Sequence, residues 1–589
     1  MNEEEIRREM ESLPGGGLTV RTVKGRKYIY HQWTENGRQR SRTVSEDEAE
    51  ELRAKIGRRK ELEKKLKEGV KNPSRVSPFR TSVITGERLV RLASSVSGYR
   101  KREIFSNLEK YVCGDSHDTV CILYGLRRTG KTTLMRQMIL SLSSEDRAKT
   151  ALIQIRAEDN LGVLNRDLIE LDERGYRYIF IDEVTLMSDF IGGAALFSDI
   201  YAAEGMKIIL SGTDSLGFLL SKDEQLYGRC ILLHTTFIPY REFRNVLGLG
   251  DVDTFLRYGG TMCPGGTDYN SDVFSSFRGT DEYVNTAIAV NIQHSLENYQ
   301  GGGHFRSLLE LYRNGELTGA VNRIVEDMNH DFTVNVLTRD FKSGDFGPAK
   351  AKVRRDRKET STVLDDVDEK KLTGTLKGIL EILDRDRQKT QVKQSHADEI
   401  REYLFLLDLI DEIPLVNMTS LNERKVITVF SQCGLRYARA EALISSLLLD
   451  ERFSSLSHDE RGRIEERILD TIRGRMLEEL VLLETKKACG DRKVFKLQFA
   501  VGEFDMVVQN EKKGTIDVFE IKHSKERNEM QYRHIMNEEN VEKAAFRFGR
   551  IKRRIVLYRG ENCTLDNGVE YINVEEYLMS LGSESEEER

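Results

Sequence analysis

Apolar and polar residues alternate along the chain in patterns that change from region to region. Between residues 80 and 250, short apolar runs alternate with longer segments of helical periodicity. The apolar runs are Thr119–Tyr124, Thr150–Ile155, Tyr178–Ile181, Lys207–Leu210 and Cys230–His234. Strands that alternate with helices predict a parallel sheet buried on both faces.

Residues 1–75 show a different pattern, which predicts a small β-sheet followed by one helix. Strands are expected over Leu18–Lys24, Lys27–Thr34 and Arg38–Val44. Ser45 and Glu48 have capping-box spacing, and a long charged helix is expected to follow to about Glu68.

Basic and aromatic residues are interleaved in this small sheet. The two-residue strand period puts Arg38, Arg40 and Arg42 on one face, and Tyr28 and Tyr30 also share a face. Such interleaving suits a nucleic-acid backbone, although a solvated face over a very small core explains it equally well.

The middle of the chain predicts helices and then a hairpin. Residues 251–340 are expected to form a helical lid, and residues 341–470 a charged insertion followed by a winged helix. The winged helix is inferred from helices at Leu372–Leu383 and His396–Leu409, then strands at Ile413–Val416 and Lys425–Phe430. Winged helices bind DNA or proteins with similar frequency. Residues 471–580 predict a final α/β domain.

Composition limits the class of protein. A chain of 589 residues is long enough for about three or four domains. The net charge of -6 restricts any nucleic-acid surface to a local patch. The seven cysteines are scattered without a C-x-x-C pair, so neither a zinc site nor a disulfide framework is indicated. No stretch approaches about eighteen consecutive apolar residues, and we expect a cytoplasmic protein without a membrane span.

The segment Gly125–Thr132 matches G-x-x-x-x-G-K-[ST] and follows a predicted strand. In such a P-loop, backbone N–H groups surround the phosphates, Lys131 reaches the β/γ-phosphates, and the Thr132 hydroxyl binds Mg²⁺. We therefore expect ATP and Mg²⁺ as cofactors. The residues expected to contact the nucleotide are Gly125, Arg127, Arg128, Thr129, Gly130, Lys131, Thr132 and Thr133.

Further polar residues follow the other predicted strands. Asp182 and Glu183 end an apolar strand, where Asp182 would hold Mg²⁺ and Glu183 would polarise the attacking water. Thr213 is positioned to contact the γ-phosphate or the water. Arg229 is a candidate phosphate-sensing arginine from this or a neighbouring subunit, and its alternative role is an ordinary surface ion pair.

These motifs resemble those of the archaeal-type ATPases, AAA+/STAND-related proteins with a G-x-R-R-x-G-K-T loop. The resemblance extends to the runs Leu210-Ser211-Gly212-Thr213, Gly228-Arg229 and Phe237–Phe243. It covers roughly residues 80–560 and leaves residues 1–75 unexplained. It implies an ATPase that often carries a winged helix and a C-terminal nuclease-like domain, with homo-oligomers that place sites between neighbours. Thr213 and Asp214 depart from the Ser or Asn that many relatives have in this turn.

The C-terminal domain contains a candidate metal site. If two strands form a hairpin centred between Lys512 and Lys513, Asp505 falls opposite Glu520, and Lys522 shares their face. The carboxylates would hold a divalent metal, Mg²⁺ or Mn²⁺, while the lysine would orient and deprotonate a water. An exposed charged hairpin is the alternative.

This D-x(n)-E-x-K pattern resembles the core of the PD-(D/E)XK nucleases, and Gly474–Val481 resembles their first helix, G-x-x-x-E-x-x-V. The resemblance implies a restriction-endonuclease-like α/β domain in which Glu478 completes the metal site. The fold also has members that do not cleave.

The sequence thus predicts an α/β multidomain ATPase coupled to a metal-dependent DNA endonuclease, with Glu183, Glu478, Asp505, Glu520 and Lys522 as catalytic residues. Genome defence and mobile-element processing are equally compatible settings. Two alternatives stay open: a nucleotide-controlled DNA-binding module with a non-catalytic nuclease fold, and a signalling switch gated by ATP. The sequence leaves open whether DNA or RNA is bound, which sites are cut, and how many subunits assemble.

Overall fold

The computed structural model divides into two compact units, Met1–Arg80 and Thr81–Arg589. Each unit is described by itself. The structure describes residues 13–14, 17–23, 26–35, 38–69, 78–213, 217–218, 225–248, 250–261, 277–298, 305–339, 393–419, 425–449 and 457–582.

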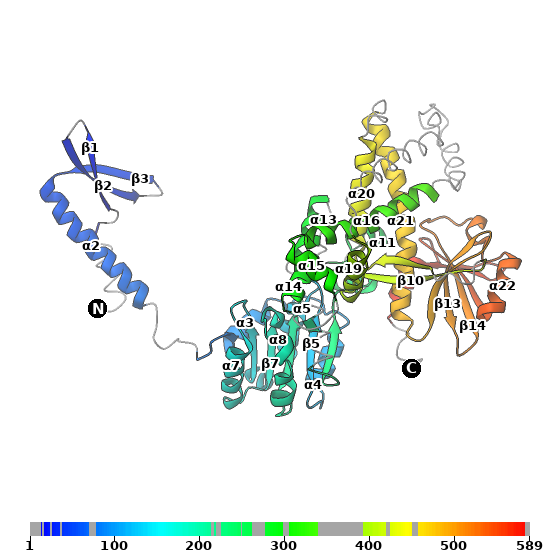
Figure 1. Ribbon diagram of the computed structural model, residues 1–589, viewed down its shortest axis with the longest axis horizontal. Coiled ribbons are helices and arrows are strands. Elements are labelled where there is room, and N and C mark those ends of the chain that lie inside the picture. The colour runs from blue at the N-terminus through cyan, green and yellow to red at the C-terminus, as the bar shows by residue number, and fades with distance from the viewer. Residues whose placement is uncertain are drawn as a thin grey trace. The chain divides into compact units, whose positions relative to one another are not determined.

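The first unit is a three-stranded antiparallel sheet with one helix, as the sequence pattern predicts (Figure 1). Its elements are β1 (Gly17–Val23), β2 (Arg26–Glu35), β3 (Arg38–Val44) and α2 (Glu46–Gly69). A small core forms where Ala49 and Leu52 of α2 pack with Val44 of β3. The Ser45 hydroxyl accepts the Glu48 backbone N–H at 3.3 Å, which satisfies one donor at the start of the helix.

The strand register places Arg42 and Tyr30 on opposite faces of this sheet. Arg42 lies opposite His31 and shares its face. Tyr30 directly precedes His31 in β2 and therefore faces the other way. Arg42 forms an ion pair with Glu48 of α2 at 2.7 Å. Contact of this sheet with nucleic acid remains a prediction.

The second unit begins with a six-stranded sheet in the order β4-β6-β7-β8-β5-β9. The strands are β4 (Ser82–Ile84), β5 (Val120–Tyr124), β6 (Thr150–Gln154), β7 (Tyr178–Asp182), β8 (Lys207–Gly212) and β9 (Cys230–His234). Strands β5 to β9 pair in parallel, so the predicted parallel sheet is confirmed. The pattern missed β4, which is only three residues long and joins the edge antiparallel.

Helices cover both faces of this sheet (Figure 1). They include α3 (Gly86–Ser94), α4 (Phe105–Cys113), α5 (Lys131–Ser141) and α7 (Leu161–Glu173). Leu134, Met135 and Met138 of α5 are fully buried against the strands. This burial fixes the helix that directly follows the P-loop.

Helices also dominate the region after the sheet, where the sequence analysis places a helical lid. They are α10 (Tyr240–Leu247), α11 (Val252–Tyr258), α13 (Phe277–Tyr283), α14 (Val290–Asn298), α15 (Arg306–Arg313), α16 (Leu317–Arg339) and α19 (Gln394–Leu406). The predicted charged insertion and the predicted helix Leu372–Leu383 lie outside the described residues. Among the helices that the structure describes, none combines the length and the apolar character needed to cross a membrane.

The predicted hairpin of the middle region belongs to the C-terminal sheet. Strands β10 (Ile410–Asn417) and β11 (Lys425–Phe430) pair antiparallel as predicted, and β10 also pairs in parallel with β12 (Lys493–Gln498). The hairpin thereby covers an edge of the sheet whose backbone groups would otherwise lack partners. A separate winged-helix domain is not established by this arrangement.

The resulting sheet has eight described strands in the order β11-β10-β12-β13-β14-β15-β17-β16. Beyond the hairpin and β12, the strands are β13 (Glu503–Asn510), β14 (Thr515–Ile521), β15 (Arg550–Tyr558), β16 (Cys563–Thr564) and β17 (Val569–Asn573). Helix α22 (Glu538–Phe548) contributes Ala544 to the core on one side. This mixed α/β arrangement agrees with the predicted α/β character of residues 471–580.

Helix α21 (His458–Ala488) runs beside this sheet (Figure 1). Ile468, Ile472, Leu477 and Leu480 are buried in a core shared with sheet residues and with α20 (Cys433–Leu448). The helix is continuous across residue 470, where the sequence analysis places a domain boundary. Its apolar stripe is buried along much of its length, which stabilises the helix as one rigid element.

A buried carboxylate joins α21 to α10. Glu484 Oε1 accepts the backbone N–H of Tyr240 at 2.5 Å, and Glu484 Oε2 has no hydrogen-bond partner among the described residues. Burial raises the pKa of Glu484 from 4.5 to about 8, against the hydrogen bond from Tyr240 and the charge of Arg241. The folded protein therefore favours the neutral acid.

We predict that Glu484→Gln gains stability relative to the parent protein as the pH rises from about 5 to about 8. The raised pKa means that the parent loses unfolding free energy over this range, on the order of 4 kcal/mol, whereas the amide does not titrate. Melting temperatures of both proteins at the two pH values measure the effect. Glu466→Gln, at an exposed position of α21, is the control, and an equal pH response of all three proteins would contradict the prediction.

Candidate nucleotide site and carboxylate cluster

The P-loop connects β5 to α5 through a turn that requires glycine at both ends. Gly125 has φ 140°, and a Cβ there would lie 2.7 Å from the Thr235 hydroxyl oxygen and 2.8 Å from that of Thr236. Gly130 has φ 88° and directly precedes the first residue of α5. Side chains rarely adopt such backbone angles, so the two glycines let the loop fold closely over β9.

Lys131 is buried at the start of α5, and its ammonium faces the loop. Nζ donates to the carbonyl oxygens of Gly125 at 2.8 Å and Leu126 at 2.9 Å. Burial lowers the pKa of Lys131 to about 8, although the nearby carboxylates of Glu183 and Asp182 oppose this shift. The Lys131 ammonium thus lies within the turn that the sequence motif assigns to phosphate.

Asp182 meets the P-loop from the neighbouring β7. Its carboxylate accepts the Thr132 hydroxyl at 2.9 Å and, on the other oxygen, the Ser211 hydroxyl. Glu183 follows with φ 57°, which turns the chain away from the strand, and its side chain is half-buried. The predicted pair Thr132 and Asp182 is therefore brought together, and the sequence analysis did not identify Ser211 as a contact of Asp182.

The remaining predicted loop residues have different surroundings. The buried Thr129 hydroxyl donates to the Leu126 carbonyl at 2.8 Å, and it also lies 2.8 Å from the Thr235 hydroxyl. Arg127 and Arg128 are exposed, whereas Thr133 is half-buried on α5. Thr129 consequently stabilises the loop from its buried side, and the two arginines lie at its surface.

A buried ion pair beneath the loop was missed by the sequence analysis. Arg102 Nε lies 2.8 Å from Glu242 Oε1, and both side chains are almost fully buried. Arg102 also donates to the carbonyl oxygens of Thr129 at 2.5 Å and Thr235 at 2.9 Å. Glu242 lies within the quoted run Phe237–Phe243, but its partner is 140 residues away in sequence.

Thr213 connects the end of β8 to the helical region. Its hydroxyl lies 3.5 Å from Glu183 Oε2, and its carbonyl accepts the side-chain amide of Asn291. Asn291 is buried and also receives the Tyr403 hydroxyl at 3.3 Å. The turn that the sequence analysis assigned to phosphate sensing is therefore held by α14 and α19.

Arg229 lies near the amino ends of the parallel strands, whereas the P-loop lies at their carboxyl ends. Its carbonyl accepts the Val120 N–H at the first residue of β5, whereas the P-loop follows the last residue of that strand. The Arg229 side chain forms an exposed ion pair with Asp199. The five residues of β5 therefore separate Arg229 from the P-loop of the same domain. A role at the site of a neighbouring subunit stays a prediction.

The C-terminal hairpin has the register that the sequence analysis predicted. Met506 pairs with Phe519, which brings Asp505 opposite Glu520. Lys522 Nζ lies 3.0 Å from Asp505 Oδ2 and 2.7 Å from Glu520 Oε2. The three predicted residues therefore form one connected group.

Glu478 approaches this group from α21, together with two residues that the sequence analysis missed. Lys496 Nζ lies 3.2 Å from Glu478 Oε2, 2.7 Å from Glu503 Oε1 and 3.7 Å from Asp505 Oδ1. Glu478, Glu503 and Asp505 offer ligand atoms within 4.8 Å of one another. Lys496 is a single lysine in the otherwise apolar run Val494–Leu497, and this pattern could have identified it.

Buried charge strongly perturbs the carboxyl groups of the cluster. Burial opposes ionisation of Asp505, but the charges of Lys522 and Lys496 outweigh it and lower the pKa of Asp505. Burial raises the pKa of Glu520, and the Asp505 charge adds to this shift while Lys522 opposes it. Glu520 Oε1 is buried without a hydrogen-bond partner among the described residues. The cluster therefore has an unused oxygen that a cation could satisfy.

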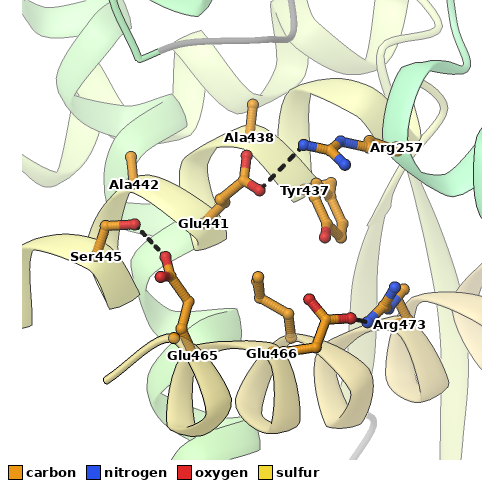
Figure 2. Close-up of a pocket in the computed structure, with 11 residues that line it drawn as sticks. Arg257, Tyr437, Ala438, Glu441, Ala442, Ser445, Glu465, Glu466 and Arg473 are labelled. Carbon is orange, nitrogen blue, oxygen red and sulfur yellow. Dashed lines mark hydrogen bonds and ion pairs between the residues drawn. The ribbon is translucent and has the colours of Figure 1, made fainter. Parts of the chain in front are cut away.

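Two pockets lie near α21. One, of about 550 Å³, lies against the carboxylate cluster, and Arg401, Arg475, Lys496 and Glu503 contribute to its wall. The other, of about 510 Å³, is bounded by residues of α11, α20 and α21 (Figure 2).

The charged residues that line the second pocket have partners within its wall. Arg257 lies 3.4 Å from Glu441, and the dashed lines in Figure 2 also join Ser445 to Glu465 and Arg473 to Glu466. The Arg257–Glu441 contact bridges α11 and α20, and the Ser445–Glu465 contact bridges α20 and α21, whereas Arg473 and Glu466 both belong to α21. We therefore assign this pocket a structural role in holding α20 and α21 together.

Comparison with known proteins identifies the nucleotide-binding region. Residues 117–244 match the family described as "AAA domain", and residues 2–54 match "Domain of unknown function (DUF6788)". None of the curated proteins matches the sequence. The AAA match covers the P-loop, Asp182 and Glu183, and the chain therefore contains an AAA-type P-loop ATPase domain.

Solved structures with similarity include PCH-2 of C. elegans, with 17% identity, a TM-score of 0.18, and coverage of 28% of this chain and 47% of that one. The chain thus spans about half the length of PCH-2. The ORC1 protein of Aeropyrum pernix in complex with DNA shows 16% identity and a TM-score of 0.19, with 61% of this chain and 93% of that one covered.

We predict that Arg102→Ala weakens nucleotide binding and lowers stability by about 3–5 kcal/mol, because Glu242 would remain buried without a partner. It also removes the donor that holds the Thr129 carbonyl in the loop. Fluorescent-nucleotide titration and thermal unfolding measure the two effects. Arg100→Ala is the matched control, since that exposed arginine donates to the Asn245 carbonyl away from the loop. Equal affinities of the two variants would contradict the prediction.

Proposed function

We propose that the protein is an ATPase coupled to a metal-dependent nuclease that acts on DNA. The observation that carries this proposal is the convergence of Glu478, Asp505, Glu520 and Lys522, which come from a helix and two strands. A surface hairpin with unrelated charges does not require Asp505 and Glu520 to be almost fully buried.

At the nucleotide site, we assign phosphate binding to the backbone of the P-loop and to Lys131. Thr132 and Asp182 would hold Mg²⁺, and the 2.9 Å separation of their oxygens supports a shared ion. We assign to Glu183 the role of polarising the water that attacks the γ-phosphate. Its half-buried carboxylate follows Asp182 at the carboxyl end of the same strand.

At the carboxylate cluster, the residues fit a hard divalent cation, Mg²⁺ or Mn²⁺. The donors are carboxylate oxygens, and the unpartnered Glu520 Oε1 adds one that protein groups do not satisfy. When bound, such an ion supplies charge neutralisation and activation of water. We assign to Lys522 the role of orienting the attacking water, since Lys522 lies between Asp505 and Glu520 and remains partly exposed.

A nucleic-acid backbone is the substrate that best suits the surroundings of the cluster. The adjoining pocket of about 550 Å³ is lined by Arg401, Arg475 and Lys496 as well as acids. Exposed arginine such as Arg401 attracts phosphate, while the cluster itself repels it until a cation is present. The proposal also includes binding to DNA, assembly into a homo-oligomer, and a protein partner that binds the middle region.

A second candidate is a nucleotide-controlled DNA-binding protein whose nuclease fold does not cleave. The observation in its favour is Lys496, an ammonium that contacts three of the cluster carboxylates. A permanent internal cation would replace the metal and abolish hydrolysis. Cleavage assays distinguish this candidate from the first.

We predict that Lys131→Ala loses ATP binding and that Glu183→Gln binds ATP but hydrolyses it at least about 100-fold more slowly. The first change removes the charge that faces the phosphates, and the second removes only the group that orients water. Phosphate release and nucleotide titration measure the two steps. Lys149→Ala, at an exposed ion pair with Glu145, is the control. Hydrolysis by Glu183→Gln at the parent rate would refute the assignment.

We predict that Asp505→Ala and Lys522→Ala reduce DNA cleavage at least about 100-fold while ATP hydrolysis is kept. Cleavage is measured on single- and double-stranded DNA and on RNA, with Mg²⁺ or Mn²⁺, with and without ATP. Lys512→Ala provides the control, because this exposed lysine lies at the tip of the same hairpin and pairs with Asp491. Cleavage by both variants at the parent rate, or a parent protein that cuts none of these substrates, would refute the nuclease assignment.

A further inference from the structure

The pairing of β12 with β13 is irregular at Lys496. Phe495 pairs with Val507, but Leu497 pairs with Phe504, so the register shifts at Lys496. One residue of β12 therefore lies opposite two residues of β13, Asp505 and Met506. The extra residue belongs to β13, so the bulge bends that strand and changes the direction of side chains such as Asp505 beside Lys496.

The Lys496 ammonium lies where three carboxylates converge. It contacts Glu503 at 2.7 Å, Glu478 at 3.2 Å and Asp505 at 3.7 Å. In the part of the chain that the structure describes, these three acids form the one group of potential metal ligands that meets the 4.8 Å separation. Lys496 itself is only 2% exposed. The Lys496 ammonium therefore already lies at the point where the potential ligand atoms meet.

The spacing of these carboxylates suits a small divalent ion. Two oxygens bound to the same Mg²⁺ at about 2.0–2.1 Å lie at most about 4.2 Å apart. A separation within 4.8 Å needs only a slight contraction to meet this limit. An ion at that point would use oxygens that Lys496 now contacts, and it would be repelled by the ammonium at close range.

The cluster also contains one more carboxyl group than cations. Four carboxyl groups, those of Glu478, Glu503, Asp505 and Glu520, face three cations, Arg475, Lys496 and Lys522. Burial favours the neutral form of Glu520 by raising its pKa. Glu520 Oε1 is buried without a hydrogen-bond partner among the described residues. This orphaned oxygen is independent of the Lys496 contacts and indicates a site that protein groups alone leave incomplete.

We propose that Glu478, Glu503 and Asp505 form the divalent-cation site and that Lys496 is its internal competitor. A metal ion enters only when the Lys496 ammonium withdraws, and the adjoining pocket of about 550 Å³, which Lys496 lines, gives the side chain space to do so. The inference deepens the proposed nuclease function, on which its biological meaning rests. It explains how one cluster holds both a lysine and the acids of a metal site.

Calorimetric titration of the full-length, nucleotide-free protein with Mn²⁺ alone tests this competition. Lys496→Met keeps the length of the side chain and removes its charge, and we expect Mn²⁺ binding to tighten at least about tenfold. Adding Glu503→Gln to this variant is expected to abolish the gain. Lys493→Met is the matched control, because this exposed lysine of the same strand pairs with Glu511 outside the cluster.

Lys496→Gln provides a second, polar replacement in case the methionine variant does not fold, which circular dichroism reports. Mn²⁺ affinities within about twofold of the parent for the folded Lys496 variants would overturn the inference. A gain that survives Glu503→Gln would overturn the proposed ligand set. If the Lys496 variants gain Mn²⁺ affinity but no protein cleaves nucleic acid, the cation site stands and the nuclease function fails.

Discussion

Helix α21 connects the two candidate sites. The same uninterrupted helix contributes one acid to the carboxylate cluster and another that contacts α10, the helix beside the P-loop. Glu478 contributes to the carboxylate cluster, and about two turns later Glu484 accepts the first backbone N–H of α10. Glu242 of α10 in turn holds Arg102 beneath the P-loop. A displacement of α10 is therefore coupled by direct contact to the helix that carries Glu478, and the buried apolar stripe of α21 resists local bending.

A second route connects the P-loop strand to the same helix. The ring of His234 stacks on Tyr124, the last residue of β5, with centroids 4.4 Å apart. His234 Nδ1 lies 3.7 Å from Asp408, which forms an ion pair with Lys487 of α21. Burial lowers the pKa of His234 to about 4, although Asp408 opposes this shift, so the imidazole is neutral near pH 7. Two separate chains of contacts thus connect the surroundings of the P-loop to α21, which carries Glu478.

Buried charge is organised differently at the two sites. Beneath the P-loop, one arginine and one glutamate neutralise each other, and the remaining guanidinium donors satisfy backbone carbonyls. Such a pair is costly to break, because either partner alone would be left charged in a medium of low dielectric constant. In the carboxylate cluster the acids outnumber the cations, and the pKa values of Asp505 and Glu520 shift in opposite directions. The first arrangement suits a fixed support and the second suits the exchange of a cation.

The features that the sequence determined by itself depend on short-range spacing. The P-loop with Lys131 follows from one motif, and the pairing of Asp505 with Glu520 follows from the two-residue period and a short turn. The parallel sheet was also predictable, because alternating strands and helices favour one arrangement. Only the tertiary structure decided that Lys496 enters the cluster, since its three acidic partners come from α21 and β13. It also decided that Arg102 pairs with an acid 140 residues away and that the middle hairpin joins the C-terminal sheet. Local periodicity specifies the faces of an element, whereas its burial partners depend on which distant surfaces pack together.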